Sequence, residues 1–286
     1  METITQKTVL MIVLISSAYL GLAGCSASKT DSQNLAISKL SLGGSSETYE
    51  ILEQLTEAYS QSTPNIKFKF YPPSRTAGGI RGVEANVLGI GGVSRKLTVE
   101  EESQGLIHVP LVEVPLLIAV HQSVTGVANV TAEQIKDIYS GKITNWQEIG
   151  GPDADITLLD STEDANEKQV LRQAYLGKDL KITPEAVVFT EDDELVESVA
   201  TTANSIAAIP LKKSLSELPI NILSIDGIEP SIENTQSRNY AMTLPLGLVL
   251  ARRTSSDVES FVAFVTGHKG QQVLDEFLEE SEVDKE

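Results

Sequence analysis

Apolar residues follow two different periods along most of the chain, beginning near Ile37. Residues 37–42 form a β-type run, a Gly-Gly-Ser-Ser turn follows at 43–46, and apolar residues between Ile51 and Tyr59 then recur at helical spacing. Further strands are predicted at 66–71, 116–121, 156–159, 187–189, 206–209 and 246–251, and further helices at 132–139, 167–175 and 258–276. Such alternation is typical of an α/β sheet protein with one or two lobes.

The N-terminus has a different pattern. Lys7 precedes an apolar stretch at 9–22, which is short for a membrane span and ends in Leu-Ala-Gly-Cys. This ending resembles the lipobox of bacterial lipoproteins. The resemblance implies a signal peptide over residues 1–24, a lipid on Cys25, which is the chain's only cysteine, and a flexible polar tether over 25–35. The protein is then expected to be exported and lipid-anchored to the cell membrane, facing the periplasm or the cell exterior.

Composition places the rest of the chain among soluble globular proteins, since 41% of its residues are hydrophobic and 22% are charged. At 286 residues it is long enough for two lobes of ordinary size. Acidic residues outnumber basic ones by 40 to 22, which gives a formal net charge of −18. This field repels nucleic acids, so no nucleic-acid partner is expected. A site for an anion would have to rely on short-range donors.

Enzymatic signatures are poorly supported. The three histidines, His108, His121 and His268, lie in no nucleophile-elbow motif and do not have metal-ligand spacing. The glycines from Gly89 to Gly92 lack the third glycine and the following helix of a dinucleotide loop. The sequence therefore predicts a binding protein that is not an enzyme and has neither a cofactor nor a metal.

One segment is specific enough to indicate a family. Residues 130–155 read VTAEQIKDIYSGKITNWQEIGGPDAD, and this order of helix, Ser-Gly-Lys turn, Asn-Trp pair and Gly-Gly-Pro-Asp turn resembles the phosphate-binding proteins of ABC transporters. Five other stretches follow in family order: GSSETYEILEQLTEAY from Gly44, GGIRGV from Gly78, GIGGVSRKLTVEE from Gly89, SIAAIP from Ser205, and DGIEPSIENTQSRNYAMTLPLGLVL from Asp226. The resemblance covers nearly all of residues 36–278.

This resemblance implies the type 2 periplasmic-binding-protein fold, in which two α/β lobes joined by two crossing strands close on a ligand. Lobe 1 is expected to comprise residues 36–120 and 241–286, and lobe 2 residues 121–240. The family also implies a monomer, phosphate or a related small solute as ligand, and the subunits of an ABC permease as partners.

Helix N-termini that face a cleft can bind oxyanions through unpaired N–H groups and a partial positive charge. By alignment with the family's motifs, the binding positions in this chain are held by Ser46, Glu47, Thr76, Gly89, Ser161, Ala165, Asn166 and Glu167. Gly89 replaces a family Asp, Ser161 replaces an Arg, and the last three positions replace a Ser-Gly-Thr group. Ser46 and Thr76 keep hydroxyl donors, whereas Glu47 and Glu167 would repel an anion if they pointed inward.

Three cations could substitute for the missing arginine: Arg75, Arg95 and Lys168. Each could equally be a surface cation, and the pair Ser94 and Arg95 could instead cap the helix that follows. Three explanations fit the altered positions: phosphate held mainly by backbone N–H groups and one of these cations, a different solute, or a degenerate relative that acts as a sensor or scaffold. The sequence favours phosphate binding for an ABC importer.

Overall fold

The computed structural model describes residues 37–281. The predicted signal peptide, the lipidated Cys25 and the tether lie outside the described residues. Within the described range, every helix is too short or too polar to cross a membrane.

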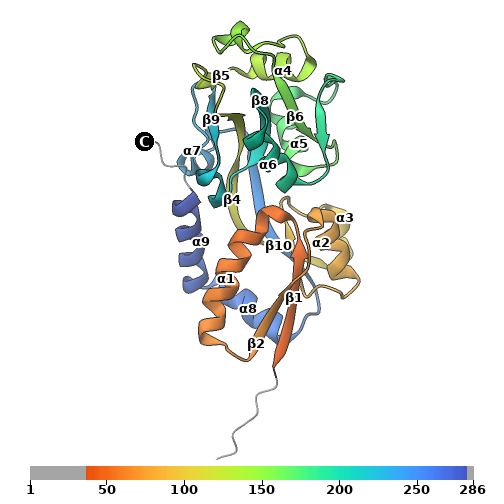
Figure 1. The fold of residues 1–286 in the computed structure, drawn as a ribbon. Coiled ribbons are helices and arrows are strands. Elements are labelled where there is room, and N and C mark those ends of the chain that lie inside the picture. The colour runs from red at the N-terminus through yellow and green to blue at the C-terminus, as the bar shows by residue number, and fades with distance from the viewer. Residues whose placement is uncertain (1–36, 282–286) are drawn as a thin grey trace, which may run out of the picture. The chain divides into compact units, whose positions relative to one another are not determined.

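The chain alternates strands and helices, as the two apolar periods predict (Figure 1). The strands are β1 (Ser38–Gly44), β2 (Ile66–Phe70), β3 (Ile90–Val93), β4 (Leu106–His121), β5 (Asn129–Val130), β6 (Thr157–Ser161), β7 (Val187–Phe189), β8 (Ser205–Pro210), β9 (Ile220–Ile225) and β10 (Thr243–Ala251). The α-helices are α1 (Tyr49–Ser62), α2 (Arg75–Glu84), α3 (Val99–Ser103), α4 (Ala132–Ser140), α5 (Asn166–Leu171), α6 (Asp192–Thr201), α7 (Ile232–Gln236), α8 (Ser256–Thr266) and α9 (His268–Ser281). Short 3₁₀ helices are η1 (Ser46–Thr48), η2 (Trp146–Ile149) and η4 (Lys213–Glu217), and η3 (Arg172–Leu176) is a π-helix.

These strands pair in the order β2-β1-β3-β10-β4-β8-β6-β7, with β9 on β4 and β5 on β9. The long strand β4 changes partners part-way along. Its residues 106–115 pair with β10, and its residues 116–121 pair with β8 and β9. We call β1, β2, β3, β10 and residues 106–115 the first strand group. Residues 116–121 with β5, β6, β7, β8 and β9 form the second strand group.

The chain returns to the first strand group beside the point where it left. The Leu116 N–H donates to the Met242 carbonyl at 2.9 Å, immediately before β10 begins. The return lies close to the predicted boundary between 240 and 241, whereas the change of partners on β4 comes earlier than the predicted boundary between 120 and 121. One apolar cluster, which includes Leu42, Leu117 and Ile209, runs through both strand groups.

Most predicted elements are confirmed, and the differences have identifiable causes. Residues 116–121 are only the end of β4, because the preceding residues alternate in burial and carry two prolines within a strand that pairs with β10. The helix predicted over 258–276 is divided into α8 and α9 at Gly267, whose backbone is extended. Helices α6 and α7 and strands β5 and β9 were not predicted.

Close backbone approach fixes the turn that follows β1. Gly44 has a φ of +124°, and a Cβ there would lie only 2.3 Å from the Gly92 carbonyl oxygen. A Cβ on Gly92 would lie 2.0 Å from the Thr48 Oγ1. Side chains larger than hydrogen would therefore separate β1 from β3. The two glycines let the ends of these parallel strands, at Ser45 and Ser94, meet.

Candidate functional site

A buried group of hydroxyls lies where β1, β3 and the start of α2 converge. The Ser45 Oγ is 2.9 Å from the Ser94 Oγ and 3.4 Å from the Thr76 Oγ1. The Ser94 backbone N–H donates to the Thr76 Oγ1 at 2.9 Å. All three residues are buried, with at most 3% of their surface exposed. The geometry follows from parallel strands, whose carboxyl ends share one edge of the sheet.

The second strand group adds an amide to these hydroxyls. The Nδ2 of Asn166, the first residue of α5, donates to the Thr76 Oγ1 at 2.8 Å and to the Ser94 Oγ at 2.7 Å. Ser45, Thr76, Ser94 and Asn166 together form what we call the hydroxyl–amide cluster. It joins residues of both strand groups through neutral hydrogen-bonding groups.

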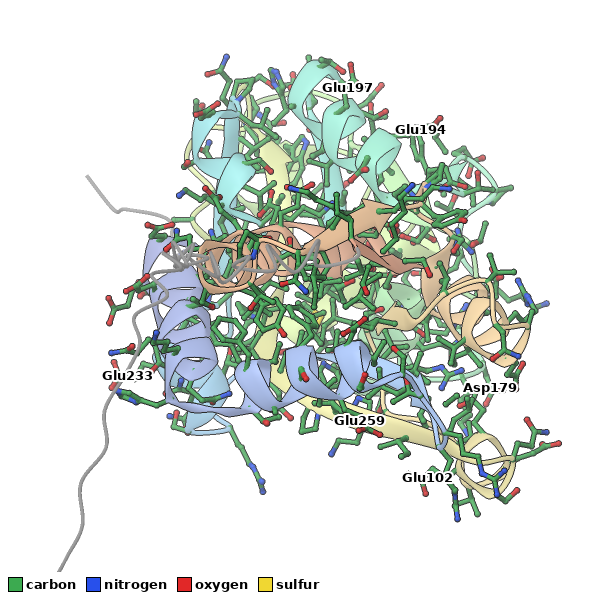
Figure 2. All side chains as sticks on the ribbon, turned by 90° about the horizontal axis from the view of Figure 1, so that it is seen from below. Glu102, Asp179, Glu194, Glu197, Glu233 and Glu259 are labelled. Carbon is green, nitrogen blue, oxygen red and sulfur yellow. The ribbon has the colours of Figure 1, made fainter. Side chains whose placement is uncertain are left out.

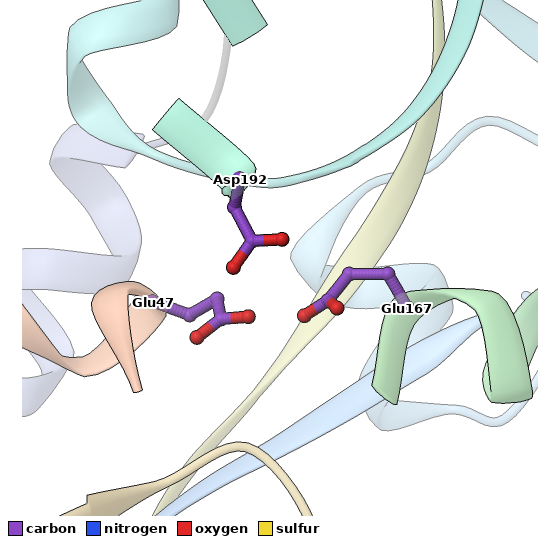
Figure 3. Close-up of side chains that lie close together, drawn as sticks. All are labelled: Glu47, Glu167 and Asp192. Atoms are coloured by element: carbon purple, nitrogen blue, oxygen red, sulfur yellow. The ribbon is translucent and has the colours of Figure 1, made fainter. Parts of the chain in front are cut away.

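Three carboxylates from three helix starts lie beside this cluster (Figure 3). Glu47, Glu167 and Asp192 each offer one oxygen, and these oxygens all lie within 4.8 Å of one another. The three residues are only 5%, 3% and 9% exposed, respectively. The Ser45 Oγ donates to the Glu47 carboxylate, so this carboxylate cluster is in direct contact with the hydroxyl–amide cluster.

Burial distinguishes these carboxylates from the rest of the acidic surface. Figure 2 labels six carboxylates that are exposed and spread over the periphery: Glu102, Asp179, Glu194, Glu197, Glu233 and Glu259. Exposed charges of this kind are solvated and keep the protein soluble. A buried carboxylate loses that solvation, so its charge must be neutralised or paired.

The three carboxyl groups have different pKa values because they are buried close to one another. Burial raises the pKa of Glu167 well above its usual value, and the charge of Glu47 adds to the rise. Burial acts in the same direction on Glu47, but hydrogen bonds from Glu167 and Ser45 outweigh it and leave the pKa of Glu47 lowered. Burial together with the Glu47 charge raises the pKa of Asp192 to about 6. Glu47 is therefore the member that stays ionised, and Glu167 the member that stays protonated.

Two neighbouring side chains temper this negative charge. The Ser46 Oγ donates to the Asp192 Oδ2 at 3.1 Å, across the two strand groups. The Lys212 ammonium is largely buried and lowers the pKa of Glu47, but its hydrogen bond goes to the Asp193 Oδ1 at 2.6 Å. Ser46, Asp193 and Lys212 also line a groove of about 520 Å³ between α1 and α6.

Arg75 links the two strand groups on another side of the site. Its guanidinium donates to the Thr162 Oγ1 at 3.1 Å, to the Asp164 carboxylate at 3.3 Å and to the Thr190 carbonyl. The backbone of Arg75 has a φ of 59°, in the left-handed region that few side chains adopt. This start of α2 directs the arginine toward the second strand group.

The arrangement of the elements matches a known domain. A family model described as the PBP superfamily domain matches residues 28–269. The chain belongs to the PBP superfamily. Its family consists of solute-binding proteins and not of enzymes, which confirms the sequence prediction.

Named relatives of this PBP chain include phosphate-binding proteins. It is 27% identical over 280 residues to the phosphate-binding protein PstS of Borreliella burgdorferi, covering 95% of this chain and 97% of the relative. It is 24% identical over 252 residues to PstS of Bacillus subtilis, covering 82% and 81% of the two chains. A putative phosphate ABC transporter substrate-binding protein from Clostridium perfringens, solved with bound phosphate, has a TM-score of 0.75 and 25% identity over 87% of this chain and all of that one. The predicted type 2 fold is confirmed.

Two of the predicted cations of the PBP domain have other partners. The Arg95 guanidinium makes a two-pronged ion pair with the Glu101 carboxylate at 2.7 and 2.8 Å. The Lys168 side chain is fully buried, pairs with the Asp160 carboxylate and lies 4.9 Å from the centre of the Tyr139 ring. These contacts do not support a ligand role for either cation.

Among the other predicted ligand-binding positions, five lie at the two clusters, whereas Ser161 has a different partner. Ser46, Glu47, Thr76, Ser94 and Asn166 come together at the two clusters. Ser161 is buried, and its backbone N–H donates to the Asp160 carboxylate at 2.9 Å.

The structure corrects the alignment of Gly89 with the family's binding Asp. Gly89 precedes β3, at the opposite end of that strand from Ser94, and donates its N–H to the Ser41 Oγ at 2.9 Å. The carboxylate missing there therefore has no bearing on the site.

Sequence reasoning missed Ser45 and Asp192. Ser45 adjoins the predicted Ser46 in the same turn. Asp192 lies in the acidic run Glu-Asp-Asp-Glu at 191–194, and acidic residues in a first turn are typical of a helix start. That signal could have indicated α6, although it does not show that Asp192 faces Glu47.

Proposed function

We propose that this protein is the extracytoplasmic substrate-binding protein of an ABC importer, which binds phosphate or a related small oxyanion and delivers it to a membrane permease. The observation that carries the proposal is the hydroxyl–amide cluster, whose four members come from turns of both strand groups. The names of the PstS relatives and of the C. perfringens structure support phosphate as the ligand.

Chemistry at this cluster suits an oxyanion. Ser45, Thr76 and Ser94 each carry a rotatable O–H, and Asn166 carries a fixed N–H₂ group. They now bond to one another across the two strand groups. An oxyanion entering between the strand groups would accept the same hydrogens. Binding would then require the two groups to separate and close again, as in hinge closure around a ligand.

The carboxylates favour a second candidate, a different solute. Glu47 and Glu167 occupy two of the binding positions that the family resemblance implies, Glu167 in place of a threonine, and both are buried beside the cluster. An anion without a compensating cation meets repulsion from the ionised Glu47. A neutral or cationic solute would not meet that repulsion.

Export and anchoring belong to the same proposal. Residues 1–24 are the proposed signal peptide, and Cys25 carries the lipid that holds a monomeric two-lobed domain at the membrane. Lobe 1 corresponds to the first strand group and lobe 2 to the second. Cys25→Ala should move the protein from the membrane fraction to the soluble fraction. A membrane-bound Cys25→Ala protein would contradict the lipid anchor.

The decisive assay is a thermal-shift titration of the purified protein with phosphate, sulfate, molybdate and a phosphonate, at fixed pH and salt. Ligand at 100 times its Kd should add about 2.7 kcal/mol to the stability of the folded state. Thr76→Val removes one hydroxyl of the cluster at nearly constant volume and should abolish the shift. Thr56→Val is the matched control, because the Thr56 hydroxyl is buried in α1 and bonds to the Glu53 carbonyl.

Each outcome has one meaning. A saturable shift with phosphate that Thr76→Val removes and Thr56→Val keeps supports the proposal. A shift with another anion transfers the proposal to that anion. No saturable shift with any of the four anions, with or without a divalent cation, refutes oxyanion binding.

A further inference from the structure

We propose that Glu47, Glu167 and Asp192 form a binding site for one divalent metal cation of the size of Ca²⁺, which bridges the first and second strand groups. The site goes beyond the proposed oxyanion site, since it takes a ligand of opposite charge. Hard divalent cations prefer oxygen ligands, and carboxylates are the strongest of these in proteins.

Separation of the oxygens fits one ion of this size. One oxygen from each carboxylate lies within 4.8 Å of the other two. Ligand oxygens lie about 2.3–2.6 Å from Ca²⁺, so two of them on opposite sides of the ion are up to about 5 Å apart. The corresponding distance for Mg²⁺ is only about 4 Å, since its ligands lie at roughly 2.0–2.1 Å. An upper limit of 4.8 Å on these separations is compatible with coordination of one Ca²⁺ by all three carboxylates.

A second observation points to a missing ligand. Among the described residues no donor reaches the Glu167 Oε1, which is buried in a residue only 3% exposed. The contact of this carboxyl group with Glu47 depends on its proton, which a cation would replace. Figure 3 shows the Glu167 carboxyl group directed toward Glu47 and Asp192. Buried polar atoms are nearly always paired, and an orphaned one requires an explanation such as an unseen ion. A cation among the three carboxylates would satisfy this oxygen.

Nearby cations do not already fill this role. Lys212 and Arg75 act on the cluster through their charge. However, the Lys212 Nζ donates to the Asp193 carboxylate, and the Arg75 guanidinium donates to Thr162, Asp164 and the Thr190 carbonyl. Neither makes a hydrogen bond to Glu47, Glu167 or Asp192. The Ser46 side chain lines the groove between α1 and α6 and donates to Asp192.

The position of the site predicts its effect. Glu47 lies in η1, which follows β1 of the first strand group, whereas Glu167 in α5 and Asp192 in α6 follow β6 and β7 of the second. A shared cation therefore favours contact between the two groups. If the proposed function holds, the cation also places positive charge next to Ser45, which bonds to Glu47. The cation would then attract an oxyanion. The family resemblance assigns that role to an arginine, and Ser161, which replaces this arginine, carries no charge.

The test uses the full-length protein, treated with chelator and dialysed into metal-free buffer without phosphate. Isothermal titration with CaCl₂ should show one saturable site per chain, with MgCl₂ binding more weakly. Glu167→Gln and Asp192→Asn should each weaken CaCl₂ binding by at least about tenfold, because each removes one charged ligand. Glu191→Gln is the matched control, since Glu191 is exposed and adjoins Asp192 in sequence, and it should leave the affinity unchanged.

Equilibrium dialysis of the wild-type protein with CaCl₂, followed by metal analysis, keeps the test independent of how well the variants fold. The expected content is one ion per chain. No bound Ca²⁺, or equal affinity in wild type, Glu167→Gln and Asp192→Asn, would overturn the cation site. Because this titration contains no phosphate, its failure leaves the oxyanion proposal standing, and failure of the phosphate titration in chelator leaves the cation site standing.

Discussion

Lys168→Met tests whether the buried lysine stabilises the fold or binds the ligand. The Lys168 side chain is 0% exposed and pairs with Asp160, whose side chain is 5% exposed. Methionine has a similar length without the charge, so the substitution leaves a buried carboxylate unpaired. Breaking a buried ion pair in this way costs about 3–5 kcal/mol. We expect a loss of that size in the free energy of unfolding at pH 8.

The pH dependence of this loss has a definite sign. Burial raises the pKa of Asp160 even in the presence of Lys168, and without the lysine it should rise further. A raised carboxyl pKa means that the folded state holds its proton more tightly, so this group stabilises the fold at low pH and loses that stability as pH rises through the folded pKa. The loss caused by Lys168→Met should therefore be smaller at pH 5 than at pH 8.

A double variant identifies the cause. Asp160→Asn keeps an oxygen that can accept the Ser161 N–H. Combined with Lys168→Met, it should recover roughly 2 kcal/mol, a coupling within the range seen for contacting residues. Urea unfolding at both pH values gives these energies. A Lys168→Met protein within about 0.5 kcal/mol of wild type, the range of a neutral surface change, would refute the structural role.

Three further outcomes are expected. Arg95 holds the pKa of Glu101 at about 2, so the stability that the Glu101 carboxylate contributes is present above pH 4.5 and is lost as pH falls toward 2. Glu101→Gln should therefore lower the free energy of unfolding by about 1 kcal/mol at pH 7 after solvent screening, and by less in 1 M NaCl. A loss that does not depend on salt would contradict the ion pair. Trp146→Ala should cost about 3–5 kcal/mol in urea unfolding because the indole is fully buried, and a loss below about 1 kcal/mol would contradict that packing. Gly92→Ala should lower Tm by the equivalent of about 1–3 kcal/mol, since the new Cβ would lie 2.0 Å from the Thr48 Oγ1, and unchanged melting would contradict the close approach.

Hydrophobic period and turn chemistry were sufficient for much of the fold. The strands β2, β7 and β8 follow from short runs of alternating or continuous apolar residues, and the helix α4 follows from a 3.6-residue period with an N-cap threonine. Such signals are local, because each is carried by residues within one element. The first part of β4 and the break at Gly267 were not predicted, since pairing with β10 and helix packing involve residues far apart in the chain.

For the site, the sequence by itself pointed to the turns that contain Thr76 and Asn166, whose side chains can donate hydrogens, but it did not point to the turn that contains Asp192. Only the tertiary structure decided that Arg95 and Lys168 pair with carboxylates of their own, and that Asp192 meets Glu47 and Glu167. Spacing along the chain cannot show this, because the three carboxylates come from helix starts separated by more than a hundred residues between the first and last. Their proximity depends on which strands pair and on how the two strand groups close, and therefore on contacts that no local pattern encodes.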